Sequence, residues 1–237
     1  MSLYIQAAER FAHRFADLLG TPQHCQSEYD RLALDASQLR VEGGDLLGRG
    51  EFGVVALARF CAPAQHPGWA RLREAAGTSP LEPEPLVAVK TLLSMDQGES
   101  NFEAALPQIL LEARLLAVMD HPHLVRLIGV SEQRLPVQLV MEYCSLGNLL
   151  QFLRRRSGSE PQAPSLPHLA DLAAQAAAGV EYLHAKLCVH RDLAARNLLL
   201  APDATHSFAS GVVVKLGDLG LARLLRTEAD YYRVGGD

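Results

Sequence analysis

The most informative segment of this 237-residue chain is His190-Arg191-Asp192-Leu193-Ala194-Ala195-Arg196-Asn197. Asp192 supplies a carboxylate that can accept a proton from a substrate hydroxyl, and Asn197 supplies an amide that can bind a metal ion. A second carboxylate, Asp218, follows the apolar run 212–214 in the segment Lys215-Leu216-Gly217-Asp218-Leu219-Gly220. Each piece alone has an ordinary explanation in turns and helix caps. Their order and spacing together indicate a catalytic site.

A glycine-rich loop lies upstream, at Gly48-Arg49-Gly50-Glu51-Phe52-Gly53-Val54-Val55, between strands predicted over 41–47 and 54–58. Because glycine has no Cβ, backbone amides in such a loop can approach phosphate oxygens closely. A dinucleotide-binding fingerprint would open a helix here, whereas residues 54–57 continue as a strand. The Gly-Lys-Ser/Thr of a Walker loop is absent. The loop is therefore either an ordinary β-hairpin turn that uses glycine for its backbone angles or a strand-turn-strand loop that covers phosphates.

Lys90 lies at the end of an apolar strand-like run over 86–91, where a lysine is ordinarily a solvated strand end. A helix is predicted over 107–119, with its proline in the first turn. Glu112 shares the apolar side of that helix with Leu115 and Leu116. A carboxylate among apolar residues needs a buried cation, and Lys90 is the predicted partner.

With these motifs in this order, residues 40–237 resemble a protein kinase domain, and specifically a protein-tyrosine kinase. The run 190–197 is similar to the tyrosine-kinase catalytic loop, whereas serine/threonine kinases typically carry a lysine two residues after the aspartate. The resemblance implies an α+β, bilobal fold with a β-rich small lobe, one key helix and a helical large lobe. It implies an N-terminal helical, juxtamembrane-like extension over 1–39, a small lobe and hinge over 40–144, and a partial large lobe over 145–237.

The resemblance also implies roles for single residues. Asp192 would be the catalytic base and Arg196 the arginine of its loop, while Lys90 and Glu112 form the ion pair of the active state. Asn197 and Asp218 would bind Mg²⁺, with Mn²⁺ as an alternative. The residues implied to bind ATP are Gly48, Gly50, Gly53, Val55, Ala88, Lys90, Met141, Glu142, Cys144 and Leu199, with Met141 as gatekeeper and 142–144 as hinge. An apolar spine linking the lobes would comprise Leu116, Leu127, His190 and Leu219.

Twin tyrosines, Tyr231 and Tyr232, lie where the resemblance places the activation loop, as in receptor kinases of the insulin-receptor and neurotrophin-receptor type. Their phosphorylation would add negative charge, with Arg191 as the expected cationic partner. Two solvent-exposed tyrosines without a regulatory role are the alternative.

Three departures from the family pattern stand out. The metal-binding triplet reads Asp-Leu-Gly, and leucine is expected to replace the usual phenylalanine without loss of metal binding. An insert over 61–85, with a short helix near 69–75, is expected at the outer edge of the small lobe, away from the catalytic groups. Residues 201–211 are expected to lengthen a hairpin.

Composition excludes several classes of protein. Apolar residues make up 49%, and 27 acidic residues face 22 basic ones, so disorder, nucleic-acid binding and anionic-membrane binding are not indicated. The four cysteines are far apart without metal-binding spacing, and we expect reduced thiols. No secretory signal begins the chain, and charged or polar residues interrupt the apolar stretch 166–189. We therefore expect a cytoplasmic location, with a membrane involved only if the chain belongs to a larger receptor.

The sequence stops inside the implied activation loop, so we expect a fragment of a larger kinase domain. The expected partners are ATP, protein tyrosine substrates and a receptor or adaptor. Further expected elements are an amphipathic helix over 3–19, strands over 124–130 and 137–142, and helices over 148–155 and 166–184, the last with uncovered apolar faces. The rival to a tyrosine kinase is a non-catalytic, kinase-like regulatory fragment that binds nucleotide.

Overall fold

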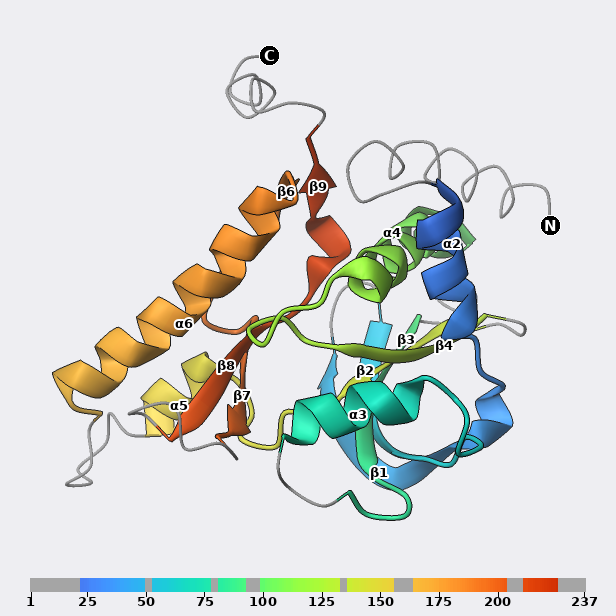
Figure 1. The fold of residues 1–237 in the computed structure, drawn as a ribbon, viewed down its shortest axis with the longest axis horizontal. Coiled ribbons are helices and arrows are strands. Elements are labelled where there is room, and N and C mark those ends of the chain that lie inside the picture. Colours follow the sequence, from blue (N-terminus) through green and yellow to red (C-terminus); the bar gives the residue numbers. More distant parts are fainter. Residues whose placement is uncertain are drawn as a thin grey trace.

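The computed structural model describes residues 22–49, 53–77, 81–92, 99–132, 136–155, 164–203 and 211–225. Among these residues, a twisted sheet with three helices forms one part, and two further helices with short hairpins form the other (Figure 1). This arrangement confirms the predicted α+β, bilobal fold. The helix predicted over 3–19 lies outside the described residues, as do Gly50, Tyr231 and Tyr232.

The small lobe is built on a five-stranded antiparallel sheet in the order β1-β2-β3-β5-β4. Its strands are β1 (Leu39–Arg49), β2 (Gly53–Phe60), β3 (Leu86–Leu92), β4 (Leu127–Ser131) and β5 (Gln138–Glu142). The prediction of these strands is confirmed, although β4 begins three residues later than the predicted 124. Leu124 instead bridges to Leu216 of the other lobe, and this contact takes the chain away from the sheet.

Both faces of this sheet are covered, because side chains alternate between them along each strand. On β3, Lys90 and Leu92 face α4 (Glu99–Val118), whereas Val87 and Val89 face the opposite side. That opposite side packs against α3 (Gly68–Ala76), the helix of the insert, through a second apolar core. The insert therefore contains the predicted short helix, but it lies across a face of the sheet and not at its outer edge.

The helix α4 begins at Glu99, eight residues before the predicted start. The placement of Pro107 in the first turn is therefore wrong. A proline costs about 3 kcal/mol inside a helix, but this penalty is local. Good helix formers at 104–106 precede it, and the apolar side of the following turns is buried against the sheet.

Residues 22–34 pack onto the small lobe. The helix α2 (Pro22–Arg31) lies against α4, and its Tyr29 is buried with its hydroxyl donating to Glu132 Oε2 at 2.7 Å. Leu34 N donates to Val130 O at 2.9 Å, and Val130 N donates to Leu32 O at 2.8 Å. A short 3₁₀ turn, η1 (Ala36–Gln38), then leads into β1.

The second part of the molecule contains α5 (Leu149–Arg155) and α6 (Leu166–Ala185), which confirms both predicted helices to within one residue. Two small antiparallel pairs follow, one joining β6 (Cys188–Val189) to β9 (Arg223–Leu224) and one joining β7 (Leu198–Pro202) to β8 (Val212–Leu216). Between β8 and β9 lies a 3₁₀ turn, η3 (Leu219–Leu221).

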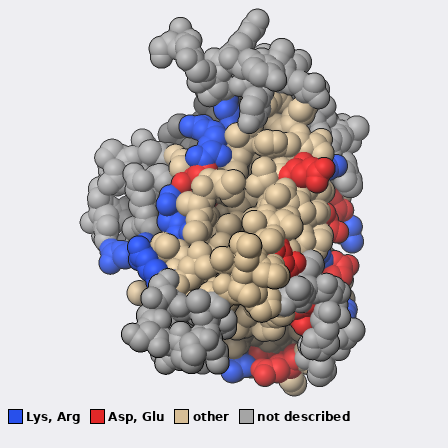
Figure 2. All heavy atoms as spheres, turned by 90° about the vertical axis from the view of Figure 1, so that its left-hand side faces the viewer, with Lys and Arg blue, Asp and Glu red and all other residues tan. Residues whose placement is uncertain are grey.

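One side of α6 packs on β8, while the other side is exposed. Leu166 is 79% exposed and Leu169 is 38% exposed. The view that faces this side of the molecule shows few charged groups across its middle (Figure 2). The predicted uncovered apolar face of α6 is thus present. Among the described residues, no helix has the length and apolar character needed to cross a membrane.

Candidate active site

Lys90, Glu112 and Asp218 form one charged cluster between the lobes. Lys90 Nζ donates to Glu112 Oε2 at 2.6 Å and to Asp218 Oδ1 at 2.8 Å. The register of the sheet explains the first contact, because it places Lys90 on the face of β3 that packs against the apolar side of α4. Glu112 is almost fully buried, with a side-chain exposure of 1%. The predicted contact between Lys90 and Glu112 is therefore present.

The cluster has two carboxylates for one ammonium group. Burial alone would lower the pKa of Lys90, but the charges of Glu112 and Asp218 outweigh it and raise this pKa. Burial raises the pKa of Glu112 despite the nearby ammonium group. Burial also acts to raise the pKa of Asp218, but Lys90 outweighs it and holds this pKa below its ordinary value. An ionised cluster carries one excess negative charge, which suits a cation at Asp218.

The loop 190–197 is held together by bonds to Asp192. Arg196 Nη2 donates to Asp192 Oδ1 at 2.5 Å, and Asn197 Nδ2 donates to Asp192 Oδ2 at 2.8 Å. Asn197 Nδ2 also donates to the backbone oxygen of Asp192 at 2.8 Å. The carboxylate of Asp192 is thereby fixed in orientation while its side chain keeps 27% exposure to solvent. A base in this position can be reached by a substrate hydroxyl.

Two hydrogen bonds join the loop of Asp192 to the loop of Asp218. The Nε2 atom of His190 lies 3.0 Å from Gly217 O, and Gly217 N donates to Asn197 O at 2.9 Å. Because Asp192 N donates to Nδ1 of His190, the ring proton belongs on Nε2, which donates to Gly217. The site is therefore one connected unit from Glu112 to Asp192.

Two residues of the site have left-handed backbone angles. The φ angle is 68° at Arg191 and 61° at Asp218. Such angles are uncommon for residues other than glycine and concentrate at functional sites. At Asp218 the turn follows β8 directly and brings the carboxylate to Lys90.

The sheet places the other predicted nucleotide-binding residues around this cluster. Val55 pairs with Gly48 on β1 and with Lys90 on β3, while Ala88 pairs with Met141 on β5. Leu199 lies on β7 of the other lobe. Residues directly opposite in antiparallel strands share a face, so Val55, Lys90, Ala88 and Met141 lie on the same side of the sheet.

Gly53 begins β2 where the backbone of β3 comes very close. A Cβ atom at this position would lie 2.3 Å from Thr91 O, which no side chain could tolerate. The packing of β2 on β3 by itself therefore requires glycine at this position.

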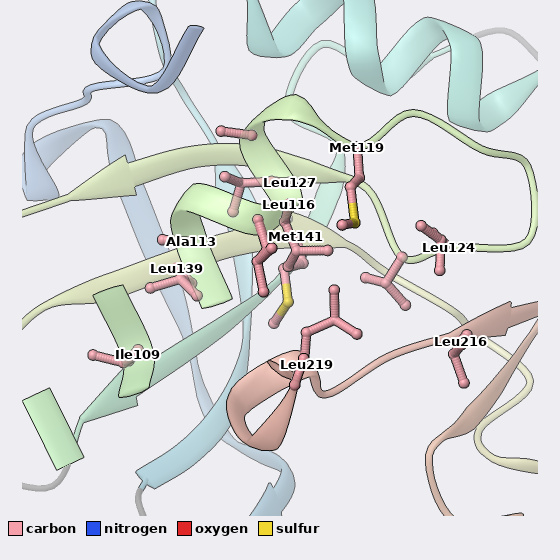
Figure 3. Packing of buried hydrophobic residues seen from close by; sticks show 14 of the residues in the cluster. Ile109, Ala113, Leu116, Met119, Leu124, Leu127, Leu139, Met141, Leu216 and Leu219 are labelled. Atoms are coloured by element: carbon pink, nitrogen blue, oxygen red, sulfur yellow. The ribbon is translucent and has the colours of Figure 1, made fainter. Parts of the chain in front are cut away.

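Leu219 of the Asp-Leu-Gly triplet is completely buried. Its side chain belongs to the same apolar cluster as Leu116, Leu127 and Met141 (Figure 3). His190, the fourth residue of the expected spine, is buried beside Gly217. The leucine of the triplet is thus accommodated in the apolar core.

One ion pair at the end of β5 was not anticipated from the sequence. Lys215 Nζ lies 2.9 Å from Glu142 Oε1, and both side chains are less than 10% exposed. Lys215 Nζ also donates to Pro122 O at 3.1 Å, and Arg126 N donates to Glu142 Oε1 at 2.8 Å. The signal was present in the sequence, because a lysine at the end of the apolar run 212–214 needs a buried partner.

The donors at the site fit a hard cation. Magnesium prefers oxygen ligands and usually binds one or two protein groups together with substrate phosphates. Asn197 turns its amide nitrogen to Asp192, which leaves its oxygen side for a cation, and Asp218 supplies a carboxylate. In the described part of the chain, no three His, Cys, Asp or Glu side chains gather to hold a metal without such help.

The comparisons with known proteins agree with this geometry. The family model described as protein tyrosine and serine/threonine kinase matches residues 41–237. The chain belongs to this family.

Its relatives include the mouse high affinity nerve growth factor receptor, 39% identical over 162 residues, which cover 64% of this chain and 18% of that protein. Human tyrosine-protein kinase Fer is 37% identical over 180 residues, covering 76% of this chain and 17% of that protein. The Xenopus laevis insulin receptor is 39% identical over 160 residues, covering 65% of this chain and 11% of that protein. The chain thus spans less than a quarter of the length of each of these relatives.

Proposed function

We propose that this chain carries the ATP-handling site of a protein-tyrosine kinase, which transfers the γ-phosphoryl group of ATP to a tyrosine hydroxyl. The observation that carries the proposal is the connected cluster from Glu112 through Lys90 and Asp218 to Asp192 and Asn197. The names of the relatives and Ala194, where serine/threonine kinases typically carry lysine, support tyrosine as the acceptor.

The side chains divide the work of the transfer. Lys90 lies between two carboxylates, so it can exchange Asp218 for phosphate oxygens while Glu112 keeps it in place. Asp192 orients the tyrosine hydroxyl and accepts its proton as the bond from oxygen to phosphorus forms and the bond to ADP breaks. Arg196 holds Asp192 in the required orientation.

Asn197 and Asp218 would hold Mg²⁺ or Mn²⁺, which would neutralise charge on the phosphate oxygens. Gly48, Gly50 and Gly53 would cover the phosphates. Adenine would lie between Val55 and Ala88 above and Leu199 below, with Met141 behind it. The backbone of Glu142 and Cys144 would bond to its edge.

The proposal is tested by measuring phosphotyrosine formation on a tyrosine peptide with Mg-ATP. Lys90→Met and Asp192→Asn are each expected to lower the rate by about 10²–10⁴-fold, because each removes a group that acts in the transition state. Lys186→Met, an exposed lysine outside the site, is the control and should react like the unaltered chain. Equal rates for Lys90→Met and the control would contradict the proposal, and binding of Mg-ATP without transfer would favour the non-catalytic reading.

Regulation through Tyr231 and Tyr232 is a separate part of the proposal. Phosphate on either residue would add nearly two negative charges and could dock on Arg191, which is exposed beside Asp192. Mass spectrometry after incubation with Mg-ATP should find phosphate on these tyrosines. Its absence from both in a chain that phosphorylates peptides would contradict this regulation.

We also propose a cytoplasmic location and a receptor or adaptor as partner. The structure contains free thiols at Cys61, Cys144 and Cys188, which fits a reducing compartment.

A further inference from the structure

Arg71 connects the inserted helix α3 to both ends of the segment that joins α4 to β4. Its Nη2 atom donates to Ala117 O at 2.8 Å, and its Nη1 atom donates to Leu127 O at 3.2 Å. Ala117 lies in the last turn of α4, and Leu127 is the first residue of β4. One guanidinium group thus spans the whole connection between the two elements.

The chemistry of this contact favours a fixed helix end. The last four carbonyl groups of a helix have no partner within the helix, and its C-terminus carries partial negative charge. A guanidinium group satisfies both needs, and hydrogen bonds from a charged donor are stronger than neutral ones. The side chain of Arg71 is only 18% exposed, so solvent competes little for these carbonyls.

A second contact from α3 reaches the same connection. Glu74, one turn after Arg71, forms an ion pair with Arg126, which also pairs with Asp120 at 2.7 Å. Arg71 itself lies 4.0 Å from Glu28 of α2. A cavity of about 230 Å³ opens beside these groups, away from Lys90, and its charged lining residues pair with one another. The insert is therefore tied to the end of α4 by charge and by hydrogen bonds, in addition to its apolar packing.

The ties between α3 and the end of α4 also bear on the position of Glu112. Glu112 lies five residues before Ala117 on the same helix, and its contact with Lys90 depends on where α4 sits relative to the sheet. We propose that α3 is a positioning element for the active site and that Arg71 is its positioning residue. By fixing the C-terminal end of α4 to β4, Arg71 keeps Glu112 on Lys90. This inference rests on the proposed function, because it assigns Arg71 a role in nucleotide binding.

The test compares Arg71→Gln with Arg73→Gln, an exposed arginine two residues along the same helix. Binding of a non-hydrolysable ATP analogue with Mg²⁺ is measured by calorimetry on the full chain. Arg71→Gln should raise the dissociation constant by about tenfold, the effect of losing a charged hydrogen bond. Arg73→Gln should leave it unchanged.

A double-variant cycle separates positioning from general stabilisation. If Arg71 acts through Glu112, Arg71→Gln should change the dissociation constant by less than about twofold in a Glu112→Gln background. If Arg71 only stabilises the fold, its effect on binding should be the same in both backgrounds, which would overturn the inference. Should Arg71→Gln fail to fold by circular dichroism, Arg71→Lys replaces it, since it keeps the charge but cannot span both carbonyls.

The failure of this inference differs from the failure of the proposed function. An unaltered chain that does not bind the analogue would overturn the proposed function and this inference with it. An unaltered chain that binds the analogue as tightly as Arg71→Gln does would overturn the role of Arg71 alone.

Discussion

Asp218 shows how one residue combines a structural cost with a chemical role. Its left-handed backbone angles cost on the order of 1–2 kcal/mol for a residue with a Cβ atom. The ion pair with Lys90 acts against this cost and holds the carboxylate toward the ammonium group. The sequence predicted the residue from its spacing to Asp192. The left-handed turn could not be predicted, because aspartate adopts such angles more readily than most residues but at only a minority of its positions.

The cysteines differ in their expected reactivity. Burial raises the pKa of Cys188 to about 12, and burial together with the charge of Glu142 raises the pKa of Cys144. Since the thiolate is the reactive form, both thiols should resist iodoacetamide in the folded chain at about pH 8. Cys61 is half-buried and should react faster. Peptide mass spectrometry measures the three rates, and equal labelling of Cys61 and Cys144 before unfolding would contradict the assignment.

The contact of Lys90 with Glu112 could be predicted, whereas those of Arg71 and Lys215 were missed. The first pair combines a lysine in an apolar strand with a glutamate on the apolar side of a helix, and both patterns are local. The carbonyl partners of Arg71 have no side-chain signature, because every residue carries a carbonyl group. Lys215 had the same local signal as Lys90, but its partner Glu142 lies on another strand that only the assembled fold brings near.

At the scale of the elements, the pair of Lys215 and Glu142 links β8 to the end of β5. Because both charges are buried, removal of one leaves the other unpaired, at a cost of about 3–5 kcal/mol. Glu142→Gln and Lys215→Met should each lower the free energy of unfolding by about 3 kcal/mol, measured by urea denaturation and circular dichroism. The double variant should lose less than the sum of the two, and single losses below about 1 kcal/mol would contradict this account.

The docking of α3 should depend on pH through His66. Its Nδ1 atom accepts from Gly68 N at 3.0 Å, and its Nε2 atom lies 3.2 Å from Ala33 O. Burial holds the pKa of His66 below the ordinary histidine value, although the bonds to backbone carbonyls oppose this. The unfolded chain therefore binds a proton more readily than the folded chain. The contribution of neutral His66 to the free energy of unfolding is fully present when the pH is above the ordinary histidine pKa. It is lost as the pH drops through that pKa.

The measurement uses Trp69, the single tryptophan of the chain, which lies in α3 and packs edge-on against Phe60. Its fluorescence should show a lower urea midpoint at about pH 5.5 than at about pH 7.5. His66→Gln should reduce this difference. His168→Gln, a change at an exposed histidine on α6, should not. An unchanged difference in His66→Gln would assign the pH dependence to other groups, such as His121, whose pKa is also lowered by burial.

Most elements could be predicted from periodicity, and the exceptions have physical causes. The start of α4 was wrong because Pro107 was taken as a boundary, whereas the buried apolar side of the helix outweighs one proline. The helix α3 was predicted, but its position was not. Its apolar side packs on the face of the sheet that carries Val87 and Val89. This face forms only once the strands are assembled.

At the scale of the whole molecule, α6 exposes Leu166 and Leu169 to solvent. They belong to the side of the molecule where Figure 2 shows few charged groups across the middle. Such surfaces bind apolar dyes and promote association. Replacing Leu166 and Leu169 by glutamine should lower the fluorescence of bound anilinonaphthalene sulfonate and reduce light scattering, without changing the circular dichroism. Unchanged dye binding would show that another surface is responsible.

The face of the sheet that α3 covers makes a later loss of residues 61–85 costly for the fold. Val87, Val89 and Ile128 are apolar and fully or almost fully buried there, under the insert. While α3 covers this face, apolar side chains there are kept out of water, and a polar one would lose its hydrogen bonds to water. A deletion of residues 61–85 would expose the apolar side chains to water, at about 25 cal/mol for each Å². Loss of residues 61–85 should therefore destabilise the small lobe unless polar side chains replace Val87, Val89 and Ile128.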